Sequence, residues 1–316
     1  MDAGPPPGPH RRITGSAGLL VALRNLGLIG HPSQDLRLAH YTADDGQEIP
    51  VRVLGRGTPV VLVHGLGCSH HHWLPVARRL ARRHLVLAWD ARGHGHCRPH
   101  PGTRVTLARL GRDLGQLIEH FELRRATLVG HSMGALTVMQ YLQDHGGGRL
   151  AGVGLVDQSP RIVTDDDWRL GMFGGCSAAM LQGLIAGARQ DLAETVLRQV
   201  ESATGAWLRR RLAPEAALGR LLRRWLSRVD ASALLDLAES LAAADFRALL
   251  PRLDLPLWVV LGGRSAHYAN VPLEPYYRST VPHATVAVYP RCGHSPHVGE
   301  PARYARELMR FIDDHR

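Results

Sequence analysis

The stretch Gly130-His131-Ser132-Met133-Gly134 decides the fold. It follows an apolar run at residues 126–129 and precedes apolar residues at helical spacing over 135–142, so we expect a buried strand, a tight turn and a helix. Glycines two positions before and after the serine remove side chains that would collide in so sharp a turn. The turn strains the serine backbone and lifts its hydroxyl clear of the strand, at the positive end of the helix. The stretch therefore predicts a nucleophilic serine, Ser132.

Apolar runs of the same kind recur along the chain, with helical patterns between them, and no strand pattern appears between residues 158 and 250. Strands and helices in this alternation form a mostly parallel sheet with helices on both faces. The sequence predicts four parts: a tail and short helix at 1–35, an α/β core at 36–157, a helical cap at 158–250, and the rest of the core at 251–316.

Composition narrows the class of protein. The net charge is +10, but its 38 cationic residues are all arginines scattered along the chain, so we expect no nucleic-acid partner. Apolar runs are too short for stable membrane insertion. The four cysteines form no C-x-x-C pair and are expected to be free thiols in a reducing compartment, which favours a cytoplasmic location over export. The oligomeric state is left open.

A serine needs a base to take its proton, and histidine suits that role near neutral pH. Of the 19 histidines, His294 follows the predicted strand 284–289 directly, so it is expected at the carboxyl edge of the sheet together with Ser132. The run His70-His71-His72 is not expected to bind a metal, because adjacent residues diverge around a helix axis. We expect no metal and no cofactor.

Acyl transfer also needs donors for the developing oxyanion. The backbone N–H groups of Met133, after the serine, and of Leu66, in the glycine loop after the first core strand, are the predicted donors. The predicted substrate-pocket residues are His64, His131, Trp168 and Phe173. The competing interpretation is that His64 shapes its loop, that His131 points away from the serine, and that the apolar cap residues form the core of the cap.

Four motifs occur in order: His64-Gly65, Asp90-x-Arg92-Gly93-x-Gly95, the serine turn and Gly293-His294. With them the chain, from about residue 36 to the end, resembles the α/β-hydrolase superfamily. The resemblance implies a mostly parallel, eight-stranded sheet and an inserted cap of variable structure. It also implies a serine nucleophile and a histidine base held by an acid. Relatives with aspartate in place of the serine, the dehalogenases and epoxide hydrolases, are excluded.

The acid departs from the common pattern. Most members carry it in a G-x-x-D sequence after the strand that follows the cap, but here that sequence is Gly262-Gly263-Arg264-Ser265. Asp157 ends the strand after the serine unit and should reach the same sheet edge, as in some members of the superfamily. We therefore predict Asp157 as the triad acid. The alternative is a strand-end residue that turns the chain toward Pro160.

The predicted activity is hydrolysis of a small to medium apolar carboxylic ester, thioester or lactone through an acyl-enzyme, with a small-molecule ester as the partner. Two alternatives within enzymes use a similar triad: a carbon–carbon bond hydrolase and a cofactor-free perhydrolase. A third alternative is a binding protein that keeps the fold without turnover, because fold alone does not fix function.

Overall fold

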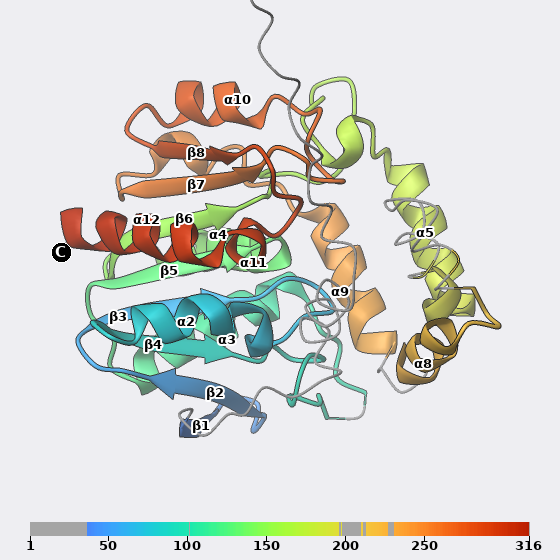
Figure 1. The fold of residues 1–316 in the computed structure, drawn as a ribbon, viewed down its shortest axis with the longest axis horizontal. Helices are drawn as coiled ribbons and strands as arrows, with labels where there is room; N and C mark the ends of the chain where they lie inside the picture. The colour runs from blue at the N-terminus through green and yellow to red at the C-terminus, as the bar shows by residue number, and fades with distance from the viewer. Residues whose placement is uncertain are drawn as a thin grey trace, which may run out of the picture.

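The computed structural model describes residues 37–100, 102–195, 213–226 and 231–315, together with residues 197 and 210. Eight strands form one sheet in the order β1-β2-β4-β3-β5-β6-β7-β8 (Figure 1). The strand bounds are β1 Arg37–Thr42, β2 Glu48–Leu54, β3 Thr58–Val63, β4 His84–Trp89, β5 Ala126–His131, β6 Leu150–Val156, β7 Leu257–Gly262 and β8 Thr285–Tyr289.

From β4 to β8 every neighbouring pair is parallel, whereas β1 and β2 form an antiparallel hairpin at one edge. The predicted mostly parallel, eight-stranded sheet is confirmed. Parallel strands need crossover connections, which explains why helical patterns separate the apolar runs in the sequence. Their carboxyl ends then lie along one edge, which is where ligands bind in such sheets.

Helices cover both faces of the sheet: α2 and α12 lie in front in Figure 1, and α3 and α4 lie behind. Alternate side chains of β3 enter different cores, with Val60 and Leu62 in one and Val61 and Val63 in the other. The helix bounds are α2 Leu74–Leu80, α3 Leu107–His120, α4 Met133–His145, α5 Ala178–Gln190, α8 Ala217–Leu226, α9 Ala231–Ala243, α10 Leu273–Thr280, α11 Pro296–Gly299 and α12 Pro301–Asp314, with 3-10 helices His70–Trp73, Met172–Gly174 and Leu250–Arg252.

The helices α5, α8 and α9 come between β6 and β7 in the chain, within the range predicted for a cap. They lie on the side toward which the arrowheads of the parallel strands point (Figure 1). The predicted tail and short helix at 1–35 lie outside the described residues. In the part of the chain that is described, no helix is long and apolar enough to cross a membrane.

All four cysteines are free, as predicted: Cys97, Cys176 and Cys292 are buried and Cys68 is half-buried. Burial raises the pKa of each thiol, to about 12 for Cys68 and Cys97 and to about 11 for Cys292. The thiolate forms are therefore disfavoured at neutral pH.

Candidate active site

Ser132 links β5 directly to α4 and has a backbone φ of 54° and ψ of −122°. This left-handed conformation is rare for a residue with a side chain and is found mostly at functional sites, where the surrounding structure enforces it. Here the serine N–H donates to the carbonyl of Val156 on β6 (3.1 Å), and its own carbonyl accepts from the N–H of Ala135 (2.8 Å). The sharp turn predicted from the sequence is present, and the serine is half-buried at its tip.

The glycines around Ser132 are required by close backbone packing. A Cβ on Gly130 would overlap the backbone at Gly134, and a Cβ on Gly134 would overlap the carbonyl oxygen of Val63 on β3. Neither obstacle is the flexible end of a side chain, so strand and helix would have to move apart. The spacing of the motif thus follows from the contact between β5, α4 and β3.

Substituting Gly134 by alanine is expected to lower the free energy of unfolding by about 1–3 kcal/mol, because overpacking forces the backbone to shift. Urea unfolding measures the change. The matched control is Gly148→Ala, at a position with no atom within 4 Å of the new Cβ, which should stay within about 0.5 kcal/mol of the original chain. Equal stabilities for the two variants would contradict the steric account of the turn.

Asp157 and His294 meet at the carboxyl edge of the sheet. Asp157 directly follows β6 and is fully buried, and its Oδ2 accepts a hydrogen bond from Nδ1 of His294 at 2.6 Å. The side chain of His294 is 21% exposed, whereas that of Asp157 is fully buried, and the contact with Asp157 uses only one of the two ring nitrogens. Among the described residues Ser132 Oγ has no hydrogen-bond partner, and such contacts in hydrolases often tighten only when substrate binds.

Ser265, the position where the common pattern has an acid, has a role that the sequence analysis missed. Its hydroxyl donates to Oδ2 of Asp157 at 2.6 Å, and the N–H of Gly262 donates to Oδ1 at 2.7 Å. With His294 this gives the buried carboxylate three donors, as a desolvated charge requires. The sequence position of Ser265, just after β7, could have predicted this contact, because the loop after β7 lies at the sheet edge where Asp157 follows β6.

The loop after β3 packs against the serine turn. A Cβ on Gly65 would lie 3.3 Å from the Cβ of Ser132, so the lack of a side chain allows the close approach. Leu66 follows in this loop with 40% of its side chain exposed. Met133 begins α4, where a backbone N–H has no carbonyl within the helix to bind. The two predicted oxyanion donors thus lie in segments that flank Ser132.

His64 and His131, two of the predicted pocket residues, are 0% and 2% exposed, and their hydrogen bonds are to backbone groups of the protein. His64 accepts from the N–H of Ala91 at Nε2 (3.0 Å) and donates from Nδ1 to its neighbour's carbonyl, Gly65 (2.9 Å), which shapes the loop. His131 donates from Nε2 to the carbonyl of His294 (2.8 Å). Burial lowers the pKa of both histidines, to about 4 for His64, so both imidazoles are neutral.

Phe173, in the cap segment, lies near the predicted base His294. Between the two lies His267, a residue that the sequence analysis missed. Phe173 is 38% exposed and stacks on the ring of His267 (5.4 Å between centroids), which in turn lies 4.1 Å from the ring of His294. Burial lowers the pKa of His267 to about 3, so this neighbour adds no charge beside the base. His267 stands two residues after Ser265 in the same strand-end loop.

Trp168 is 6% exposed, and its contacts explain its burial without a ligand. Its indole N–H donates to the carbonyl of Arg161 (3.0 Å), and its ring faces Tyr276 of α10 (5.1 Å) and the guanidinium of Arg247 (5.3 Å). None of these residues belongs to the predicted triad. The packing matches the alternative interpretation of the cap residues, as part of the protein's own core.

Known proteins with this arrangement of strands and helices include esterases. The chain is 28% identical over 265 residues to a pimeloyl-(acyl-carrier protein) methyl ester esterase of Chromobacterium violaceum, covering 83% of this chain and 97% of the relative. It is 26% identical over 281 residues to a non-heme chloroperoxidase of Kitasatospora aureofaciens, covering 86% and 98%. An esterase from Exiguobacterium antarcticum superposes with a TM-score of 0.73 at 21% identity, over 87% of this chain and 99% of that one.

A sequence profile of the alpha/beta hydrolase family matches residues 60–307, a range that runs from β3 into α12. The match therefore includes the serine turn, Asp157, the helices between β6 and β7, and the loop that carries His294. The chain belongs to the alpha/beta hydrolase family.

Proposed function

We propose that the protein is a serine esterase that hydrolyses small to medium apolar carboxylic esters. The observation that carries the proposal is the 2.6 Å hydrogen bond from His294 Nδ1 to the buried carboxylate of Asp157, on the sheet edge where Ser132 sits in its strained turn. The carboxylate holds the imidazole in the tautomer whose Nε2 lone pair can take a proton, and it stabilises the imidazolium that forms.

In this mechanism Ser132 Oγ attacks the ester carbonyl while His294 takes its proton as general base. The tetrahedral oxyanion accepts hydrogen bonds from the N–H groups of Leu66 and Met133. His294 then donates the proton to the leaving alkoxide, which departs as the alcohol and leaves an acyl-enzyme. Water, deprotonated by the same imidazole, attacks the acyl carbonyl, and the acid and free Ser132 are released.

The preference for apolar esters is supported by exposed apolar side chains. Among the described residues four large hydrophobic side chains are 38–45% exposed: Leu38, Leu66, Phe173 and Met180. Leu66 flanks the serine turn, Phe173 stacks beside His267, and Met180 lies on α5. Exposed apolar groups next to a few convergent polar groups are typical of sites for apolar ligands.

The test is covalent labelling with a fluorophosphonate, which phosphonylates an activated serine. We expect one adduct per chain on Ser132, and no adduct in Ser132→Ala, with the peptide identified by mass spectrometry. Ester hydrolysis, followed with p-nitrophenyl esters from acetate to dodecanoate, should fall by at least about 10³-fold in the same variant. A folded original chain that takes no label would overturn the esterase proposal and favour a binding protein.

Similarity to a chloroperoxidase favours one second candidate, perhydrolysis, in which hydrogen peroxide replaces water as the acceptor of the acyl group. Attack of peroxide on the acyl-enzyme would give a peracid and free serine, with no redox change in the protein. Product analysis separates the two activities. If peracid forms faster than carboxylic acid at millimolar hydrogen peroxide, the protein is a perhydrolase.

A further inference from the structure

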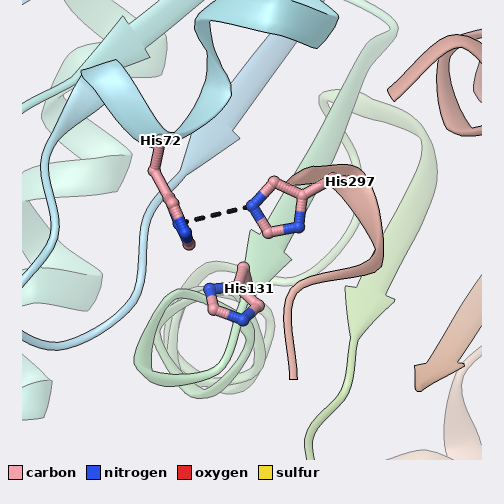
Figure 2. Close-up of side chains that lie close together, drawn as sticks. All are labelled: His72, His131 and His297. Carbon is pink, nitrogen blue, oxygen red and sulfur yellow. Dashed lines mark hydrogen bonds between the residues drawn. The ribbon is translucent and has the colours of Figure 1, made fainter. Parts of the chain in front are cut away.

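Three buried histidines from separate parts of the chain come together next to the active-site loops. His72 lies in the 3-10 helix before α2, His131 ends β5, and His297 lies in α11. They are 5%, 2% and 0% exposed. Figure 2 shows the three rings gathered around a common space, and one potential ligand nitrogen from each lies within 4.8 Å of the other two.

The hydrogen bonds of His131 leave one of its two ring nitrogens, Nδ1, with a bare lone pair. Its Nε2 lies 2.8 Å from the carbonyl oxygen of His294, and a carbonyl only accepts, so Nε2 carries the proton. A neutral imidazole has one N–H, so Nδ1 is an acceptor. No protein group in the described ranges hydrogen-bonds to Nδ1, although it is buried. An unpaired buried acceptor is costly, and a cation would satisfy it.

The spacing of the other two histidines suits a single ion. Nε2 of His297 and Nδ1 of His72 share a hydrogen bond at 3.3 Å (Figure 2), which a shared ion would replace. Two imidazole nitrogens bound at about 2.0–2.1 Å to a tetrahedral ion lie about 3.3–3.4 Å apart. Little movement is therefore needed for both rings to share one ion.

The hydrogen bond that Nε2 of His131 donates to a backbone carbonyl is also typical of a metal-binding histidine. Ligating histidines usually donate their second N–H to a carboxylate or a backbone carbonyl, which fixes the tautomer and ring orientation. His131 does this with the carbonyl of His294. The absence of a side chain at Gly65 leaves room beside Nδ1 of His131, since a Cβ there would lie 2.9 Å from that nitrogen.

We propose that His72, His131 and His297 bind one divalent transition-metal ion of the class that prefers imidazole ligands, with Zn²⁺ as the test ion. The proposal departs from the prediction of no metal. It agrees with the reasoning behind that prediction, because only one histidine of the run His70-His71-His72 belongs to the cluster. It is independent of the esterase proposal.

A second group, His70, Asp90 and His96, also has potential ligands close together. There each carboxylate oxygen of Asp90 already accepts two hydrogen bonds, one from a backbone N–H and one from an imidazole, at 2.7–3.1 Å. Those contacts account for the group as part of the loop structure. His96 therefore provides a matched control for metal binding.

The experiment starts from chelator-treated, full-length protein. Dialysis against micromolar Zn²⁺ followed by elemental analysis should give one ion bound at this site per chain, and Co²⁺ in its place should show the intense visible absorption of tetrahedral coordination. His72→Asn and His297→Asn should each weaken binding by more than about 10-fold and lose that absorption. His96→Asn should retain both.

The spectrum of the original protein with Co²⁺ tests the proposal even where a variant fails to fold. Weak absorption of octahedral type, or none, would overturn the site. So would tetrahedral absorption that persists in folded His72→Asn and His297→Asn. Because both readouts are independent of ester hydrolysis, an inactive but Zn²⁺-binding chain would contradict only the proposed function.

Discussion

Replacing Asp157 by asparagine is expected to lower kcat for ester hydrolysis by about 10³- to 10⁴-fold, with KM changed only a few-fold. The carboxylate accepts hydrogen bonds from Gly262, Ser265 and His294. An asparagine of nearly the same shape can keep its oxygen on the N–H of Gly262. Its NH₂ group then faces His294 and can only donate, so Nδ1 must become the acceptor and the proton moves to Nε2.

In that tautomer His294 cannot take the proton of Ser132, and no carboxylate stabilises the imidazolium. The measurement is kcat and KM with a p-nitrophenyl ester, with circular dichroism and thermal unfolding to verify the fold. The exposed carboxyl Asp254 provides the matched control, since Asp254→Asn should leave kcat unchanged. If Asp157→Asn kept kcat within 10-fold of the original, the triad acid would have to be another residue.

Acidification is expected to destabilise the protein strongly between pH 6.5 and pH 4. His64 and His94 are fully buried, and burial is the main cause that lowers their pKa from 6.5 to about 4 and about 3. Below pH 6.5 these residues bind protons in the unfolded chain but not in the folded one. Stability is therefore lost as pH falls, by about 1.4 kcal/mol per pH unit for each histidine.

At pH 5 the loss from this pair amounts to about 4 kcal/mol, a large part of the 5–15 kcal/mol that stabilises most domains. Urea unfolding from pH 8 to pH 5 measures it. His94→Asn removes one of the two groups and should reduce the slope of unfolding free energy against pH by about one proton, whatever its effect at pH 8. The exposed His100→Asn should leave the slope unchanged. An unaltered slope in His94→Asn would show that other groups cause the acid sensitivity.

The sequence predicted the fold because local patterns and chain topology agree. Apolar runs alternating with helical patterns indicate a parallel sheet, and parallel strands bring their ends to one edge. The same rule selected Asp157, a residue that no local motif identifies, since it follows the strand beside the one that ends at Ser132. The structure then placed Asp157 in a hydrogen bond with His294.

The surroundings of the candidate pocket residues could not be predicted in the same way. Whether His64 faces a ligand or its own loop depends on the N–H of Ala91, 27 positions away, and no periodicity reports such a contact. His131 and His297 approach His72 only through packing between β5, α11 and the segment before α2. The role of Ser265 could not be predicted either. A serine at the usual position of the acid suggests that the acid is lost, whereas here its hydroxyl donates a hydrogen bond to Asp157, which follows the neighbouring strand.

The raised pKa values of the four thiols affect how fast the cysteines of this protein are oxidised. Oxidation to sulfenic acid begins from the thiolate, and burial keeps Cys97, Cys176 and Cys292 in the thiol form. Reagents that modify cysteine should therefore react slowly with the folded chain. Peroxide should likewise oxidise these three buried cysteines more slowly in the folded chain than in the unfolded chain.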